Sequence, residues 1–518
     1  MKLNYKRTIL VGFAFFLICA FWQAYDNTIP LILTNKFGMS QAWSGVIMAL
    51  DNILALFLLP LFGAISDRCT SRRGRRTPFI VVGTLIAAVL LIALSFVDGA
   101  QLRHIRDVST IDDPQALETI YERESGSTLI TPAGQKFVLG EKFTLEEFTA
   151  IRSQITQDGG EMVTNPDYTN YVVPARQACA WQATAESPTT LVFSIVLLFM
   201  ILVSMAVFRS PAVALMPDVT LKPLRSKANA VINLMGSAGG ILVLILGMVF
   251  ATSAVHNSLM SYTGYFGIIA AVMLAALVVF MLTVREPEWA AEMREQSVAL
   301  GLEESGENGE GGGRRLSMDE IKSLVFILLS IVLWFFGYNA VTSKYSVYAS
   351  NILHKDYNLT LIIAQAAAIV AYLPVGFIAS KVGRKKTILA GVLMLTAAFT
   401  VASFLNASSP TMLMNAMFAL AGIAWATINV NSFPMVVEMC SGGDVGKYTG
   451  FYYTASMAAQ VATPMLSGLL MDKLGMHVLF PYAAAFTALA FVTMLFVHHG
   501  DSRPEAKKGL DALEDMDN

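Results

Sequence analysis

Long apolar runs separated by short polar connections recur along the whole 518-residue chain. A bilayer core needs about 20 residues of apolar helix, and each run is long enough to supply them. The pattern predicts twelve membrane-spanning helices, over residues 8–34, 41–65, 78–97, 189–216, 229–252, 263–284, 322–350, 361–380, 387–405, 411–437, 448–470 and 478–498. We therefore expect an all-α membrane protein. The run that follows MKLNYKR is interpreted as the first span and not as a cleaved signal peptide.

Composition supports this class. Hydrophobic residues make up 55% of the chain and charged residues 14%, whereas a soluble domain carries roughly 25% charge. The net charge of −2 argues neither for nor against a nucleic-acid partner, and we expect none; the four cysteines fit no metal-ligand spacing. We expect a monomer embedded in the lipid bilayer of the plasma (inner) membrane, without cofactor or metal.

Lysine and arginine are concentrated in alternate connections. The connections after the second, fourth, sixth and eighth predicted spans are basic, as are both ends of the chain, while the intervening short connections carry very few cations. The positive-inside rule then places both termini in the cytoplasm. On this topology the long segment 99–187 lies on the outer side of the membrane.

Two basic connections resemble each other at an offset of 313 residues. GAISDRCTSRRGRRTPFIVVG starts at Gly63 and GFIASKVGRKKTILAGV starts at Gly376. Such duplication is typical of transporters built from two six-helix halves with a central site. We therefore expect an N-terminal half over 1–284 that carries the 99–187 insertion, a cytoplasmic linker over 285–321, a C-terminal half over 322–498 and a tail over 499–518.

The insertion has a coarse α+β pattern and shows no catalytic cluster. QKFVLGEKF, residues 135–143, is predicted as strand. Thr144 and Glu147 have capping-box spacing, which predicts a helix start. That helix would place four apolar residues on one face: Leu145, Phe148, Ile151 and Ile155. Ser317 and Glu320 form a second capping box before the seventh span.

Residues 66–79 read SDRCTSRRGRRTPF, and this stretch resembles the signature between helices 2 and 3 of the major facilitator superfamily. Its form is most similar to sucrose:proton symporters and their relatives, near the glycoside–pentoside–hexuronide:cation symporters. The twelve-helix resemblance covers the chain apart from 99–187 and about 290–316. It implies a secondary active transporter, and so not an enzyme, with proton-coupled symport of a disaccharide or glycoside by alternating access.

The chain departs from these families at two places. Plant-type sucrose carriers have an arginine in helix 4, and the matching position here is Val213; Arg209, one helical turn earlier, could substitute. Sodium-coupled melibiose-type carriers have two acids in helix 2 where this chain has Ala55 and Leu59. The second departure favours protons over sodium as the coupling ion.

The resemblance also implies a cytoplasmic gate, in which Asp67 and nearby arginines pair with helix ends across the interface between the halves. The candidate gate residues are Asp67, Arg68, Arg75, Arg76, Asp218, Arg384 and Glu438. The alternative is that the basic stretch only anchors the topology.

Ionisable side chains inside membrane helices are costly and so are functional candidates. At 1.5 Å per residue, Asp26 and Asp51 lie about 27 and about 24 Å from the cytoplasmic helix ends, so they share a level and are the predicted proton-coupling pair. Alternatively Asp26 lies at a wet outer mouth, or either acid pairs with Asn27, Asn52 or Lys344. Snorkelling to the outer surface is the simplest interpretation of Lys344.

Sugars are bound by hydrogen bonds and by aromatic rings against their apolar faces. In facilitator-type transporters helices 1, 4, 7 and 10 line the cavity. The predicted substrate contacts are Trp22, Gln23, Arg209, Tyr338, Asn339, Trp425 and Asn429. Packing is the alternative role for each aromatic. Two other functions stay open: an exporter of drugs or metabolites on the same fold, and a membrane sensor. No GxxxxGK[ST] motif occurs, which disfavours an ATP-driven pump.

Overall fold

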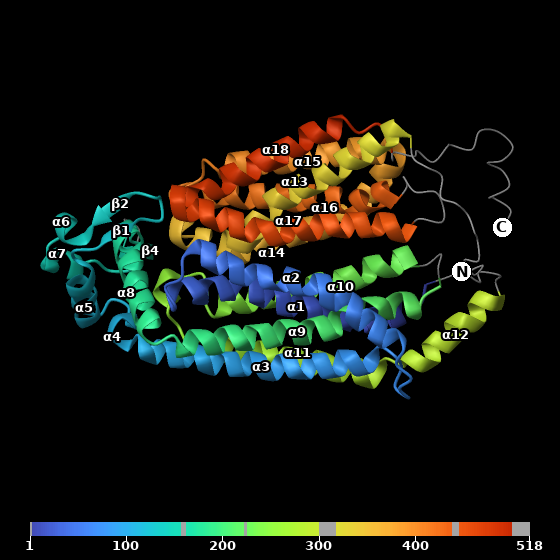
Figure 1. Ribbon diagram of the computed structural model, residues 1–518, viewed down its shortest axis with the longest axis horizontal. Helices are drawn as coiled ribbons and strands as arrows, with labels where there is room; N and C mark the ends of the chain where they lie inside the picture. The colour runs from blue at the N-terminus through green and yellow to red at the C-terminus, as the bar shows by residue number, and fades with distance from the viewer. Residues whose placement is uncertain (1–2, 157–161, 222–224, 300–316, 438–444, 500–518) are drawn as a thin grey trace.

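The computed structural model describes residues 3–156, 162–221, 225–299, 317–437 and 445–499. Long helices that coincide with the twelve predicted spans form an elongated bundle (Figure 1). They are α1 (Tyr5–Asn35), α2 (Gln41–Asp67), α3 (Thr77–His104), α9 (Thr189–Asp218), α10 (Arg225–Val249), α11 (Thr263–Thr283), α13 (Met318–Tyr348), α14 (Tyr357–Val382), α15 (Arg384–Ala402), α16 (Thr411–Val437), α17 (Val445–Leu474) and α18 (Leu479–Leu495). The predicted all-α membrane fold is confirmed.

Within the described residues, ten of these helices contain a stretch long and apolar enough to cross a membrane. The described apolar stretch of α14 is Tyr357–Tyr372, and α17 is the other helix outside these ten. Both pack against the opposite half of the molecule, α14 against α10 and α17 against α2. These two helices therefore lie along the boundary between the halves.

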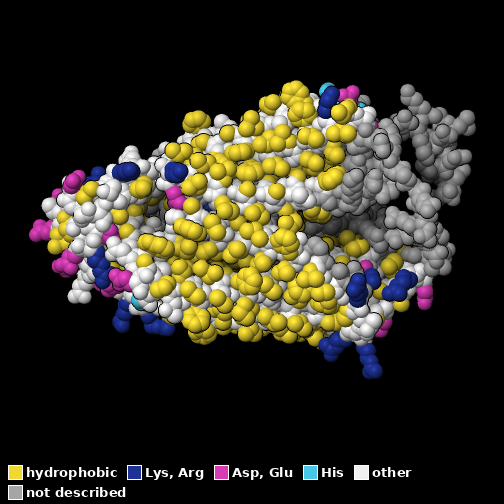
Figure 2. Space-filling model, in the orientation of Figure 1, with side chains coloured by type: hydrophobic (Ala, Val, Ile, Leu, Met, Phe, Trp, Pro, Cys, Tyr) yellow, Lys and Arg dark blue, Asp and Glu magenta, His cyan; other side chains and the backbone are white. Residues whose placement is uncertain are grey.

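On the face shown in Figure 2, apolar side chains cover the middle of the bundle and charged side chains gather toward its two ends. This is the surface expected of a protein whose middle faces lipid. Large apolar side chains on several helices are exposed, among them Phe57, Phe96 and Val249.

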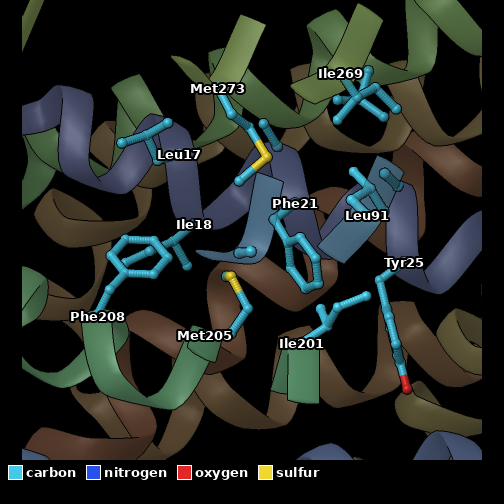
Figure 3. Packing of buried hydrophobic residues seen from close by; sticks show 14 of the residues in the cluster. Leu17, Ile18, Phe21, Tyr25, Leu91, Ile201, Met205, Phe208, Ile269 and Met273 are labelled. Carbon is cyan, nitrogen blue, oxygen red and sulfur yellow. The ribbon is translucent and has the colours of Figure 1, made fainter. Parts of the chain in front are cut away.

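Each half has its own hydrophobic core. In the N-terminal half, side chains from α1, α3, α9 and α11 interdigitate (Figure 3). Phe21 and Met205 lie at the centre of this packing, and Tyr25 points its hydroxyl away from the cluster. In the C-terminal half, Trp334 and Phe480 belong to a separate core. Because each half is packed around its own core, the two can move as bodies.

The insertion between α3 and α9 projects from one end of the bundle (Figure 1). It contains α4 (Arg106–Ser109), α5 (Pro114–Glu124), α6 (Leu139–Lys142), α7 (Leu145–Thr149), the π-helix η1 (Tyr168–Val172) and α8 (Val173–Glu186). Strands β1 (Thr128–Ile130) and β2 (Lys136–Val138) form one antiparallel hairpin, and β3 (Gln154–Thr156) and β4 (Met162–Thr164) form another. The helices and β1 share a small core of their own.

Two predictions for the insertion were wrong in extent. Only Lys136–Val138 of the 135–143 stretch is strand, because the chain turns into α6 directly afterwards. The capping box at Thr144 and Glu147 is confirmed, but its helix ends at Thr149. Phe148 of this helix and Ile151 just beyond its end are buried, whereas Ile155 pairs with Val163 in the β3–β4 hairpin.

Short elements complete the connections: η3 (Val255–Asn257), η4 (Ala349–Leu353) and η5 (Met476–Val478). The second capping box is confirmed, since Ser317 and Glu320 open α13. Within the linker, α12 (Glu286–Ala299) forms a helix that the hydropathy pattern did not indicate. Its Glu292 pairs with Arg7 at 2.6 Å, and Arg7 lies over the ring of Trp289.

Candidate functional site

Two carboxylates and one guanidinium meet inside the N-terminal half. Asp26 of α1, Asp51 of α2 and Arg209 of α9 lie close enough for their charges to interact. Asn52 donates a hydrogen bond of 2.7 Å to Asp51 Oδ1, as one of the sequence alternatives anticipated. The equal heights predicted for the two acids thus correspond to a real juxtaposition. This cluster combines two acids with one base in the middle of a membrane protein.

Aromatic rings flank this charge cluster. The Arg209 guanidinium lies over the Trp22 ring, 5.6 Å from the ring centroid, which is cation–π geometry. From the C-terminal half, Tyr338 interacts electrostatically with Asp26. Tyr338 and Trp425 stack face to face with centroids 3.6 Å apart and planes inclined by 2°. The stack of α13 and α16 side chains presents a flat apolar surface toward Asp26 of α1.

A pair of amides joins the halves beside these rings. Gln365 of α14 donates a hydrogen bond of 2.5 Å to the side-chain oxygen of Gln23 on α1. Gly240 of α10 faces this pair, and a Cβ there would meet Gln365 Oε1 at 3.1 Å. Tyr372, which follows Gln365 on α14, forms a hydrogen bond with Asn429. The predicted residues Gln23 and Asn429 therefore each have a partner on α14.

Gln365 and Tyr372 were missed at the sequence level. Both are polar or amphipathic side chains inside the eighth predicted span, α14. An inventory of the polar side chains in that span would have found them. Asn339 is half-buried, and within the described residues its Nδ2 has no hydrogen-bond partner. The same holds for Trp22 Nε1. These buried donors are available for a ligand.

At the end of the bundle opposite the insertion, Arg75 and Arg76 both pair with Asp218, at 2.7 and 2.8 Å. Asp218 ends α9, so these ion pairs lie within the N-terminal half, and the expectation that they cross the interface was wrong. Helix α9 ends beside the start of α3 and brings Asp218 to the arginines. Arg68 is exposed and Arg384 begins α15.

The remaining gate predictions are not tested by these contacts. Glu438 and the side chain of Asp67 lie outside the described residues. A residue that the sequence did not indicate completes the cluster: the Glu286 carboxylate accepts backbone N–H bonds from Arg75, Arg76 and Thr77. It is 2% exposed and caps the N-terminus of α3.

At the end of the bundle that carries the insertion, Lys344 is fully buried, so the snorkelling interpretation was wrong. Its Nζ donates a hydrogen bond of 2.8 Å to the backbone carbonyl of Gln41, at the start of α2. The Asp472 carboxylate of α17 accepts the backbone N–H groups of Gln41 and Ala42 at 2.9 and 2.8 Å. Lys344 and Asp472 also attract each other. We call this arrangement the outer clamp.

Two glycines allow α2 and α17 to approach closely beside the outer clamp. A Cβ on Gly45 would lie 2.2 Å from the Pro464 carbonyl oxygen, and one on Gly468 would lie 2.4 Å from that of Gln41. Further hydrogen bonds join the connection after α10 to the start of α14 at the same end, including Ser253 to Asp356 at 2.9 Å. Figure 1 shows the halves together near the insertion and diverging toward the opposite end. The described contacts thus join the halves at the end that carries the insertion.

Two helical halves that meet around half-buried charges and are joined at one end of the bundle define a transporter architecture. A sequence profile described as Major Facilitator Superfamily matches residues 177–366 and 327–514, and one described as MFS/sugar transport protein matches residues 10–100. The chain belongs to the major facilitator superfamily.

Among curated relatives, sucrose transport protein SUC4 of Arabidopsis thaliana is 41% identical over 60 residues, which is 12% of this chain and 12% of that protein. Proton-associated sugar transporter A of Homo sapiens is 38% identical over 94 residues, 18% of this chain and 12% of that protein. The matched stretches therefore span about an eighth of the length of these relatives.

Two solved structures share the fold over nearly the whole chain. The inward-open conformation of the xylose transporter XylE from E. coli has a TM-score of 0.58 at 14% identity, and the match covers 99% of this chain and 100% of that one. A D-xylose-proton symporter has a TM-score of 0.56 at 15% identity, with 96% and 99% covered. At these identities the likeness establishes the fold alone.

Proposed function

We propose that the protein is a secondary active transporter that carries a sugar, a disaccharide or glycoside, together with a proton by alternating access. The observation that carries the proposal is the convergence of Asp26, Asp51 and Arg209 with aromatic and amide side chains from both halves. The names of the relatives agree with it, since they include sucrose transport proteins and a proton-associated sugar transporter.

The charge cluster supplies the proton site in this proposal. Two carboxylates share one guanidinium, so the cluster carries an excess negative charge that one proton neutralises. Asn52 donates a hydrogen bond to Asp51. Asp26 is the acid that interacts with Tyr338 of the other half. Protonation of an acid weakens its hold on Arg209, whose five N–H donors then become available to hydroxyl groups.

The sugar would bind between the charge cluster and the C-terminal half. The Tyr338–Trp425 stack offers an apolar surface for the C–H face of a sugar ring. Trp22 Nε1 and Asn339 Nδ2 are buried donors without partners among the described residues, and Gln23 and Gln365 supply further donors and acceptors. Because these groups come from both halves, a ligand that contacts them all couples its binding to the relative position of the halves.

The same proposal places the chain in the plasma membrane, as a monomer with both termini in the cytoplasm. The basic residues near the start of α3 and the N-terminus of α1 lie at the end of the bundle opposite the insertion. This distribution supports that orientation through the positive-inside rule. Asp67, Arg68, Arg384 and Glu438 remain proposed members of the cytoplasmic gate, whereas Arg75, Arg76 and Asp218 form ion pairs within the N-terminal half.

Uptake into proteoliposomes tests the proposal. Purified protein is reconstituted, and radiolabelled disaccharides and glycosides are supplied with and without an inward proton gradient. We expect accumulation above equilibrium for at least one sugar, dependent on the gradient and collapsed by a protonophore. The proposal fails if no sugar in a broad panel moves protons or accumulates. Accumulation of sugar driven by sodium at constant pH would support the proposed substrate class but refute the proposed coupling to protons.

A further inference from the structure

The insertion is fixed to the N-terminal half. Gln101 at the end of α3 donates to the backbone carbonyl of Lys36 at 2.9 Å and to Thr184 of α8 at 3.0 Å. Gln177 of α8 donates to Asn35 at 2.9 Å. In addition, the buried Lys36 ammonium, at the end of α1, contacts both carboxylate oxygens of Asp98 of α3 at 2.5 and 2.6 Å. The insertion therefore moves with α1 and α3.

One turn of the insertion nevertheless contacts the other half. The turn between β1 and β2 is closed by a hydrogen bond of 2.9 Å from Thr131 N to the Gln135 carbonyl. At its tip, the Pro132 carbonyl accepts a hydrogen bond of 2.6 Å from the backbone N–H of Met476, in the α17–α18 connection. A Cβ on Gly134 would lie 2.9 Å from the Leu474 carbonyl oxygen. Backbone packs directly on backbone here.

This contact adjoins the outer clamp. Asp472, which holds the N-terminus of α2, is two residues before Leu474 and four before Met476. One short stretch of the C-terminal half, 472–476, is thus held twice by the N-terminal half, by α2 from inside the bundle and by the insertion from outside. Alternating access requires the outer ends of the halves to separate, so both contacts must break in each cycle.

We propose that the insertion is an outer strut of the transport cycle, in which the Thr131–Gln135 turn binds the α17–α18 connection and stabilises the state closed to the outside. The inference rests on alternating access from the proposed function, but not on the identity of the substrate. Loss of the contact raises the population of the outward-open state, because the closed state loses a binding energy that the open state never had.

Thiol labelling measures this population without any substrate. Ser44 of α2 is fully buried next to Gly45 at the closed outer interface, so Ser44→Cys in a chain whose four native cysteines are replaced by alanine reports outer opening. The probe is a membrane-impermeant maleimide added outside. We expect Gly134→Asn to raise the labelling rate severalfold, because asparagine tolerates the positive φ of this position while its Cβ displaces the turn from Leu474.

Gly126→Asn is the matched control, since Gly126 lies in the same insertion and a Cβ there meets nothing within 4 Å. We expect it to label at the parent rate. Equal labelling of the Gly134→Asn, Gly126→Asn and parent proteins, at equal amounts of folded protein by size-exclusion chromatography, overturns the strut.

A cross-link supplies a second, independent test in the full-length chain. Pro132→Cys and Met476→Cys place thiols on the two hydrogen-bonded residues. We expect oxidation to stop uptake and reductant to restore it, with each single-cysteine variant unaffected by oxidation. Undiminished uptake by the fully cross-linked protein overturns the proposal. If the parent protein transports no sugar, the proposed function fails, and the labelling experiment still decides whether the strut exists.

Discussion

Lys344 of α13 donates a hydrogen bond of 2.8 Å to the backbone carbonyl of Gln41, across the boundary between the two halves. A buried ammonium is stable only with partners, and here they are that carbonyl and the nearby Asp472. Asp472 in turn receives the first N–H groups of α2, where the positive end of the helix dipole favours an anion. Three helices are thus held at one point.

Asp472→Asn is expected to weaken the outer clamp by about 1–3 kcal/mol, because it replaces charge-assisted hydrogen bonds with neutral ones and leaves Lys344 without its counter-charge. The closed state loses this energy, so Ser44→Cys should become more accessible from outside. Lys473→Gln, on an exposed neighbouring residue, is the control and should leave accessibility unchanged. Unaltered accessibility in Asp472→Asn would contradict a clamping role.

Asp51→Asn and Asp26→Asn remove one negative charge each from the cluster around Arg209. We expect at least one of them to abolish gradient-driven accumulation while leaving sugar counterflow, since counterflow needs binding and alternation but no net proton movement. Asp107→Asn, on an exposed residue of the insertion that pairs with Arg123, should retain full accumulation. Accumulation that survives in both cluster variants would exclude these acids as the coupling site.

Gln365→Ala removes the amide that bridges to Gln23. If Gln365 contacts sugar, the KM for uptake should rise by roughly tenfold, the equivalent of about 1.4 kcal/mol, with a smaller change in the maximal rate. Gln296→Ala, on an exposed glutamine of α12, should leave the KM unchanged. A normal KM with a reduced maximal rate would instead mean that the bridge serves closure and not binding.

Glu286→Gln tests the cap on α3. The Glu286 carboxylate accepts bonds from Arg75, Arg76 and Thr77 while 2% exposed, so loss of its charge should cost about 1–3 kcal/mol of stability. A lowered thermal unfolding midpoint in detergent would report this. Glu288→Gln, whose side chain is 65% exposed, should leave the midpoint in place. Equal midpoints for the two variants would refute the cap.

Cys179 should resist alkylation in the folded protein. Burial, followed by the nearby Glu124 carboxylate, raises the pKa of its thiol to about 12. The thiolate is the reactive form, so at pH 8 only about one molecule in ten thousand carries it. Mass spectrometry after brief treatment with iodoacetamide should find Cys179 unmodified in the native protein and modified after denaturation. Rapid modification of the native thiol would show that this site opens.

The sequence predicted the spans and not the contacts between them. Apolar runs determine where helices cross the bilayer, so α1 to α3 and α9 to α11 were found from hydropathy. The level shared by Asp26 and Asp51 followed from helix rise alone. Gln365, Asp472 and Glu286 were not indicated, because each acts on a residue of another helix far along the chain. For the same reason, the pairing of Arg75 and Arg76 with Asp218 was expected across the boundary between the halves but lies within one half. The spacing of charges does not specify which helix end lies beside the α2–α3 loop.

Within the described residues, α17 contains no stretch long and apolar enough to cross a membrane, and this has a consequence for biogenesis. A helix with weak hydropathy partitions poorly into lipid on its own, so α17 requires neighbours already in the bilayer when it inserts. Its partner α2 belongs to the half that is made first. The N-terminal half can therefore serve as a template for the C-terminal half, and variants that loosen the boundary are expected to lower the yield of inserted protein as well as its rate of transport.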